Sequence, residues 1–391
     1  MYPMPMKWDR ERKQLVVFPW WKFKIWVFVI TVKILLIGCG SLIFVSVRQR
    51  FNPHPEVTIA HIAFFWGCLC IALADVGTSY LAIFKWPEVL PQTMQNVLSF
   101  HAELQRNFPN PFKQVNNARA RSAIYGSKTL SFFVKITSTI PILLACIFIL
   151  INFDPYYFIS HYFIGDPIYY DRKIIVLTLM CRLIMAALDA AEGIRVIMMV
   201  WTIYYAMIWI IITDLKVLIQ SLIANYLRSL SLRRLELIML LVNQLRLIII
   251  CNFSVFTAQL CAILISTGFS SCVVAIWLAI KGVTRFPFYI LLIFFGFFSA
   301  MQLFFAILFN TVVSIHGNSE VLILLLRRLT RNLSKNKKFD VKKILALHKQ
   351  SQAIRPILMK CGKFFGFHRG IHLIYMDLLV QFVANSLILV E

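Results

Sequence analysis

The sequence predicts an all-α polytopic membrane protein with seven transmembrane helices, a cytoplasmic amino terminus and an extracellular carboxy terminus. Hydrophobic residues make up 60% of the 391 residues, and the mean hydropathy is +0.76. This apolar content is higher than a soluble domain needs to fill one core. A helix needs about 20 apolar residues to cross the hydrocarbon layer of a bilayer. Seven stretches reach that length: 25–47, 57–84, 131–153, 174–213, 247–280, 287–314 and 371–390.

The orientation follows from where the positive charges lie, because cytoplasmic loops retain Lys and Arg. Of the 40 Lys and Arg, 30 lie before the first stretch or in every second connection after it, whereas 6 lie in the other connections. The amino terminus is therefore expected inside and, after seven crossings, the carboxy terminus outside. This is the reverse of a G-protein-coupled receptor. The net charge of +23 alone would suit a nucleic-acid binder, but this alternation along the chain argues for membrane topology and against nucleic acid as a partner.

The most basic connection is the segment 315–370, which holds 13 of the Lys and Arg. Juxtamembrane basic clusters commonly face lipid headgroups, so membrane lipids are expected partners. Val341, Ile344, Leu345 and His348 follow a helical spacing, so a helix here could also bury one face against another copy of the chain. The sequence has no internal repeat. A single membrane domain, 1–391, accounts for the chain, with 315–370 as a cytoplasmic anchor segment.

The last apolar stretch carries polar residues along one helical face. Asp377, Gln381, Asn385 and Ile388 follow three- and four-residue steps. An intramembrane carboxylate is costly unless it is hydrated, which favours a water-facing stripe. Hydrogen bonding to neighbouring helices is the alternative interpretation. Several copies of this helix around an axis could enclose a pore, in which rings of carboxylates would favour cations.

The same stretch reads Tyr375, five residues and then Gln381 and Phe382, close to the end of the chain. This pattern resembles the seventh-span motif of insect gustatory receptors, which reads Thr-Tyr, five hydrophobic residues and then Gln-Phe. Ile374 replaces the Thr of the motif, and Asp377 interrupts the hydrophobic run.

This resemblance implies a ligand-gated cation channel in the cell membrane of sensory neurons. Its subunits would form a homotetramer, or a heterotetramer with other gustatory receptor subunits, and would detect a small-molecule tastant. The resemblance favours a bitter or orphan ligand over a sugar. It also implies that the helix 371–390 lines the pore and that the segment 315–370 anchors it in the cytoplasm. No cofactor or metal ion is implied.

The resemblance further implies a ligand pocket in the outer half of the helical bundle. Charged and aromatic residues of the outer half are the candidates: His61, Phe65, Arg182, Asp189, Tyr289 and Phe295. Arg182 and Asp189 are seven residues apart and share a helical face, so they could neutralise each other or contact a ligand. His61 could equally be an interfacial residue, and the aromatic rings could be packing contacts. The aromatic segment 154–171 predicts an interfacial belt or a cover over a vestibule.

Other functions fit the sequence less well. An odorant-receptor-type channel shares the topology and stays open as an alternative. A secondary transporter would be expected to show two similar halves with broken helices, which an odd span count without a repeat does not support. An enzyme would need convergent catalytic groups, and the eight His form neither His-Glu-x-x-His nor His-x-x-Glu-His. We therefore expect no catalytic residues.

Overall fold

The structure is a computed structural model, and nearly all of its described residues are helical. It describes residues 6–9, 14–18, 20–85, 87–115, 143, 145–150, 152, 154–164, 172–228, 232–281, 288–334, 341–361, 365–367 and 370–389. Within these ranges, two short antiparallel ribbons depart from helix. The strand β1 (Met6–Asp9) pairs with β2 (Gln14–Val17), and β3 (Lys360–Cys361) pairs with β4 (Phe365–Gly366). The predicted all-α class is confirmed.

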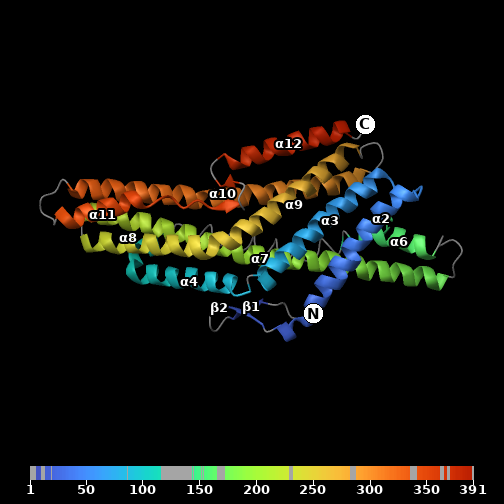
Figure 1. Cartoon of the computed structure of the whole chain (residues 1–391), viewed down its shortest axis with the longest axis horizontal. Coiled ribbons are helices and arrows are strands. Elements are labelled where there is room, and N and C mark those ends of the chain that lie inside the picture. Colours follow the sequence, from blue (N-terminus) through green and yellow to red (C-terminus); the bar gives the residue numbers. More distant parts are fainter. Residues whose placement is uncertain are drawn as a thin grey trace.

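The helices run roughly along one another in an elongated bundle (Figure 1). In chain order they are η1 (Trp20–Lys22), α1 (Lys24–Phe28), η2 (Val29–Cys39), α2 (Gly40–Phe51), α3 (Ile59–Ser79), η3 (Tyr80–Lys85), α4 (Val89–Asn107), α6 (Pro155–Ile164), α7 (Arg172–Arg228), α8 (Leu232–Leu247), η5 (Ile248–Phe253), α9 (Ser254–Lys281), α10 (Phe288–Ser334), α11 (Val341–Ala353) and α12 (Ile371–Leu389). The segments η2, η3 and η5 are π-helical, and each directly adjoins an α-helix. Each of the seven apolar stretches is helical over most of its described residues; residues 57, 58 and 152 are the exceptions.

Four helices within the described ranges are long and apolar enough to cross a membrane. They are His61–Ser79, Thr202–Ala224, Ala258–Lys281 and Phe305–Leu333, and Leu373–Asn385 is a shorter apolar helix. Most of the third predicted stretch lies outside the described residues. The chain is therefore a membrane protein by the length and composition of its helices, while the count of seven spans stays a prediction.

Two helices are much longer than a membrane crossing. The helix α7 has 57 residues and α10 has 47, against the roughly 20 that span a bilayer. The sequence predicts that the bilayer crossing ends at residue 213, with the apolar stretch 174–213. The helix α7 continues beyond this residue because Leu215, Leu218 and Leu222 are buried in the main core. The extensions of α7 and α10 lie beside α4, α8 and α11 at the left end of Figure 1. We call this assembly of α4, α8, α11 and the two extensions the anchor end.

Polar contacts fix the anchor end internally. His101 of α4 and the buried Asp214 of α7 are 2.6 Å apart between Nδ1 and Oδ1. Arg327 of α10 donates to the carbonyl oxygens of Ser351, Gln352 and Ile354 at 3.1–3.2 Å. These acceptors lie at the end of α11, where helical carbonyls lack partners within the helix. The contact therefore holds α10 to the chain that leads towards α12.

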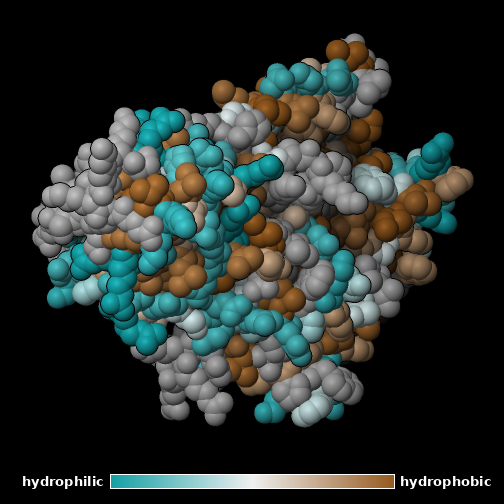
Figure 2. Space-filling model, turned by 60° about the vertical axis from the view of Figure 1, so that its left-hand side comes forward, coloured by the Kyte–Doolittle hydropathy of each residue, from teal (hydrophilic) through white to brown (hydrophobic). Residues whose placement is uncertain are grey.

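The helix α11 packs on α10 with one face. Ile344 and Leu347 are buried, whereas Val341 and Leu345 are 73% and 52% exposed. The residues predicted to share one apolar face are therefore divided. Ile344 packs within its own chain, whereas Val341 and Leu345 face outward. Figure 2 shows hydrophilic surface gathered over the left of that view, towards the anchor end, and hydrophobic surface more frequent on the right.

Candidate functional site

The helix α12 has one buried and one exposed face. Tyr375, Leu379 and Val383 are 5%, 1% and 7% exposed and lie at four-residue steps on the buried face. Asp377, Gln381, Asn385 and Ile388 are all exposed. We call these four residues the polar stripe. In Figure 1, α12 lies along the outside of the bundle, so the polar stripe faces away from the chain's own helices.

The aromatic residues of the motif hold α12 in place. The ring of Tyr375 lies 5.1 Å from that of Phe305 and 5.5 Å from that of Phe309, both on α10, and 5.7 Å from that of Phe269 on α9. Phe382 also meets Phe269, with a centroid distance of 5.3 Å. Aromatic pairs at such distances contribute about 0.5–1.5 kcal/mol beyond burial. The Tyr and the Phe of the motif therefore pack α12 on α9 and α10, while the Gln belongs to the exposed stripe.

The polar stripe is linked along its own helix. The amide Nε2 of Gln381 donates to Oδ2 of Asp377, one turn earlier, over 3.0 Å. Among the described residues, no Lys, Arg or His lies within ion-pair distance of Asp377. The carboxylate is thus placed on an apolar helix, outside the bundle, with an amide as its hydrogen-bond donor. Such a group needs water or a partner chain to be stable within a bilayer.

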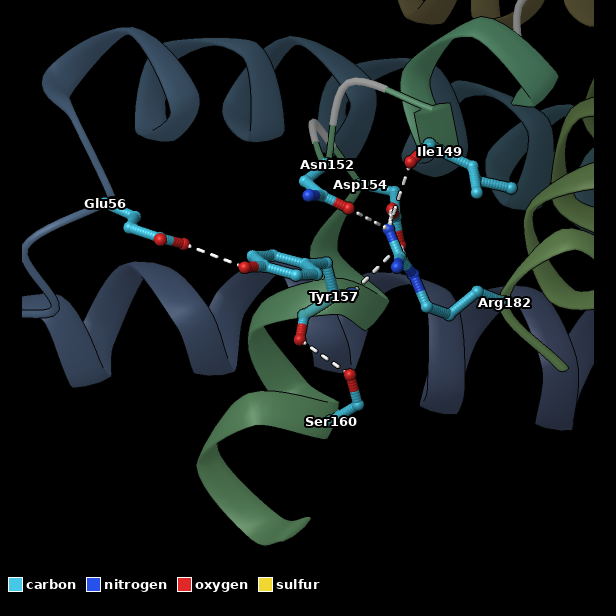
Figure 3. A network of polar contacts seen from close by, with 7 residues as sticks. All are labelled: Glu56, Ile149, Asn152, Asp154, Tyr157, Ser160 and Arg182. Atoms are coloured by element: carbon cyan, nitrogen blue, oxygen red, sulfur yellow. Dashed lines mark hydrogen bonds and ion pairs between the residues drawn. The ribbon is translucent and has the colours of Figure 1, made fainter. Parts of the chain in front are cut away.

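A second polar cluster, drawn in Figure 3, lies beside α6, at the opposite end of the bundle from the anchor end in Figure 1. Arg182 of α7 is buried and forms an ion pair with Asp154, through Nη2 and Oδ2. The same Nη2 donates to Oδ1 of Asn152 over 3.1 Å and to the carbonyl oxygen of Ile149 over 3.3 Å. The guanidinium carbon lies 4.9 Å from the centre of the Tyr157 ring. We call Arg182 with these four residues the Arg182 cluster.

One carboxylate serves two purposes in the Arg182 cluster. Oδ1 of Asp154 also accepts a hydrogen bond from the backbone N–H of Tyr157 over 3.0 Å and so caps the first turn of α6. The hydroxyl of Tyr157 in turn donates to Glu56, in the connection between α2 and α3, over 2.9 Å. The helix α6 is therefore fixed to α7 on one side and to the α2–α3 connection on the other.

The predicted pocket residues are brought together only in part. His61 and Phe65 of α3 both meet Phe158 of α6, with centroid distances of 5.4 and 6.1 Å, and Phe65 and Phe158 are buried. The ring of Phe158 fills the space between α3 and α6. Nδ1 of His61 lies 2.8 Å from Oγ1 of Thr58, so this histidine also forms part of the cap of α3.

The other predicted pocket residues have different outcomes. Arg182 joins this region through Asp154 and Tyr157, a partnership that the sequence analysis missed. Phe295 of α10 is 53% exposed. The side chains of Asp189 and Tyr289 lie outside the described residues, so the predicted contact between Arg182 and Asp189 is untested.

The fold and these two clusters define a polytopic helical membrane protein whose last helix carries a polar face on the outside of the subunit. Its structure is similar to that of the olfactory receptor OR5 from Machilis hrabei, with a TM-score of 0.54 and 12% sequence identity over 94% of this chain and 89% of that receptor. The same receptor in complex with eugenol gives a TM-score of 0.53 and 12% identity over 99% and 93% of the two chains. No protein-family model and no curated protein matches the sequence.

The chain therefore has the fold of an insect olfactory receptor. The resemblance inferred from Tyr375, Gln381 and Phe382 is confirmed at this level. The likeness does not separate a gustatory from an olfactory receptor, because the two solved structures report on the fold alone.

Proposed function

We propose that the protein is a subunit of a ligand-gated cation channel that detects small molecules, and that it is a gustatory rather than an olfactory receptor. The observation that carries the proposal is the exposed polar stripe on α12. In this proposal the segment 315–370 forms a cytoplasmic anchor, the helix 371–390 lines the pore, and the subunits form a homotetramer or a heterotetramer in the cell membrane of sensory neurons.

The polar stripe supports an assembly of several subunits. On insertion scales a carboxylate at the centre of a membrane helix costs about 2.5–3.5 kcal/mol, which hydration or pairing must offset. Asp377 faces away from α9 and α10, so its own subunit does not enclose it. A single helix cannot surround a water column, whereas several copies of α12 around an axis can. Rings of Asp377, Gln381 and Asn385 would then line the column.

The motif and the outer region support the finer parts of the proposal. Tyr375, Gln381 and Phe382 fit the gustatory pattern, and the departures from it at Ile374 and Asp377 favour a bitter or orphan tastant over a sugar. One solved receptor of this fold is in complex with eugenol, a small aromatic molecule. We place the ligand site of this chain near His61, Phe65 and the Arg182 cluster, where aromatic rings and one buried ion pair would suit a partly apolar ligand. An olfactory-type channel is the second candidate, because the solved neighbours are olfactory receptors.

The replacement Asp377→Asn tests the channel and the role of the stripe. The variant should assemble normally, because the side chain is exposed, and should lose part of its cation conductance or its selectivity over chloride. The loss should be largest at low salt, since the screening length is about 30 Å at 0.01 M and about 10 Å at 0.1 M. Reversal potentials under sodium and chloride gradients would measure it. The matched control is Glu236→Gln, an exposed carboxylate on α8. Unchanged conductance and selectivity at normal surface expression would leave the stripe without a role in permeation.

The orientation gives an independent prediction. A tag at the carboxy terminus should be stained by antibody on intact cells, whereas a tag at the amino terminus should require permeabilised cells. The reason is the 30-to-6 distribution of Lys and Arg along the chain. The opposite staining pattern would contradict both the assigned topology and the placement of the anchor end in the cytoplasm.

A further inference from the structure

Two histidines from different elements meet beside the Arg182 cluster. His54 lies in the connection between α2 and α3, and His161 lies on α6, one turn after Tyr157. Nε2 of His54 and Nδ1 of His161 are 3.4 Å apart, the ring centroids are 4.6 Å apart, and the ring planes are inclined at 80°. Both side chains are partly buried, so they remain reachable from solvent.

The spacing of the two nitrogens suits a shared metal ion. Zinc binds imidazole nitrogen at about 2.0–2.1 Å in a tetrahedral shell, which places two ligating nitrogens about 3.4 Å apart. A direct hydrogen bond between nitrogen and its acceptor is normally shorter, at about 2.7–3.2 Å. The observed 3.4 Å suits two ligands of one ion, and it is also a long hydrogen bond between the two rings in the absence of an ion.

Both histidines are held by rigid surroundings. His54 lies between Pro53 and Pro55, whose rings restrict the backbone on either side. The side chain of Gln49 accepts from the backbone N–H of His54 over 2.8 Å and donates to its carbonyl oxygen over 3.1 Å. Phe158 is buried and its ring contacts that of His54, so α6 and the connection keep their relative position. Ligands fixed in this way lose little entropy when an ion binds.

The remaining coordination positions decide how tightly an ion binds. Among the described residues, no three His, Cys, Asp or Glu side chains are grouped closely enough to hold an ion together, so this conformation supplies two protein ligands. Water would complete the shell in this conformation, because the exposed carboxylate of Glu56 accepts from the hydroxyl of Tyr157 instead. When Nε2 of His54 binds an ion, Nδ1 of the neutral ring carries the proton and can no longer accept a hydrogen bond. Metal binding therefore breaks the 3.3 Å contact between the backbone N–H of Glu56 and Nδ1 of His54. The site should therefore be weak and reversible.

We propose that His54 and His161 form a binding site for a divalent transition-metal ion, with Zn²⁺ as the ion whose geometry fits. The ion would join α6 to the α2–α3 connection and hold the outer end of the bundle closed. The proposal rests on the two side chains and their supports, and it holds whether or not the protein conducts ions.

Metal titration of the full-length protein in lipid nanodiscs tests the site. Zn²⁺ binding is measured for the wild type and for His54→Gln and His161→Gln, with His348→Gln at the anchor end as the control. Each of the first two variants should bind Zn²⁺ at least about tenfold more weakly, since loss of even an outer partner of a ligand costs that much. The control should bind like the wild type. Co²⁺ in place of Zn²⁺ should give ligand-field absorption without a thiolate charge-transfer band.

Hydrogen exchange provides a second measurement. Saturating Zn²⁺ should slow amide exchange in α6 of the wild type and of His348→Gln, and should leave α6 of His54→Gln and His161→Gln unchanged. If one variant fails to fold, the other decides, because removal of either ligand must give the same loss. Equal Zn²⁺ affinity in all four proteins, or a thiolate band that assigns the ion to an exposed cysteine such as Cys181, would overturn the proposal.

Discussion

Replacing Arg182 by Met should destabilise the end of the bundle around α6 by about 3–5 kcal/mol, because the buried Asp154 would lose its cation. Asp154→Leu should cost a similar amount, and it also removes the acceptor for the first turn of α6. Thermal unfolding of the purified protein and surface expression in cells would both report the loss. The exposed Lys173 on the same helix is the matched control, and Lys173→Met should change stability by no more than about 0.5 kcal/mol.

The double variant Arg182→Met with Asp154→Leu separates the ion pair from the packing around it. A buried pair replaced by apolar groups often leaves stability unchanged, whereas a single unpaired charge is strongly destabilising. The double variant should therefore recover most of the lost stability. If it recovers expression but its responses to ligand stay lost, the pair belongs to the ligand site as well as to the fold. Silent single variants would contradict the pair.

From the sequence, a compensating carboxylate was expected beside Arg182, but the partner in the structure, Asp154, was not identified. A buried cation in an apolar stretch needs a compensating carboxylate, and helical periodicity offered Asp189 on the same helix. The structure provides Asp154, which lies 28 residues away along the chain and before α7 begins. Such a contact depends on how the chain turns between α6 and α7, and periodicity within one helix carries no information about that turn.

The last helix was more predictable, because its two faces follow from helical spacing alone. The sequence placed Asp377 and Gln381 on one face, and the structure exposes both of them while it buries Leu379, which lies between them in the sequence. The anchor end was less predictable. Its helices continue from membrane stretches without a break, so hydropathy marked the end of the bilayer crossing at residue 213 while α7 continues to Arg228. The split face of α11 likewise depends on which helix covers it.

Leu379 and Gln381 should respond in opposite ways to substitution, although they are two residues apart on α12. Leu379 is 1% exposed within the main core, so Leu379→Ala should cost about 2–5 kcal/mol and loosen α12 from α9 and α10. Gln381 is exposed, so Gln381→Leu should change stability by no more than about 0.5 kcal/mol. In the proposed pore, however, the leucine side chains of the several subunits would form an apolar constriction. The Asp377 carboxylate would also lose its amide donor.

The two variants therefore separate packing from permeation. Gln381→Leu should reach the membrane at the level of the wild type, with reduced current per channel or altered gating, because apolar constrictions in a pore expel water. Leu379→Ala should lower surface expression and thermal stability, with unchanged selectivity in the channels that remain. Thermal unfolding, surface labelling and single-channel recording on both variants give the comparison. If Gln381→Leu lost stability as Leu379→Ala does and kept its current per channel, the exposed stripe would be a contact between helices of neighbouring subunits, and the pore would have to be sought on another helix.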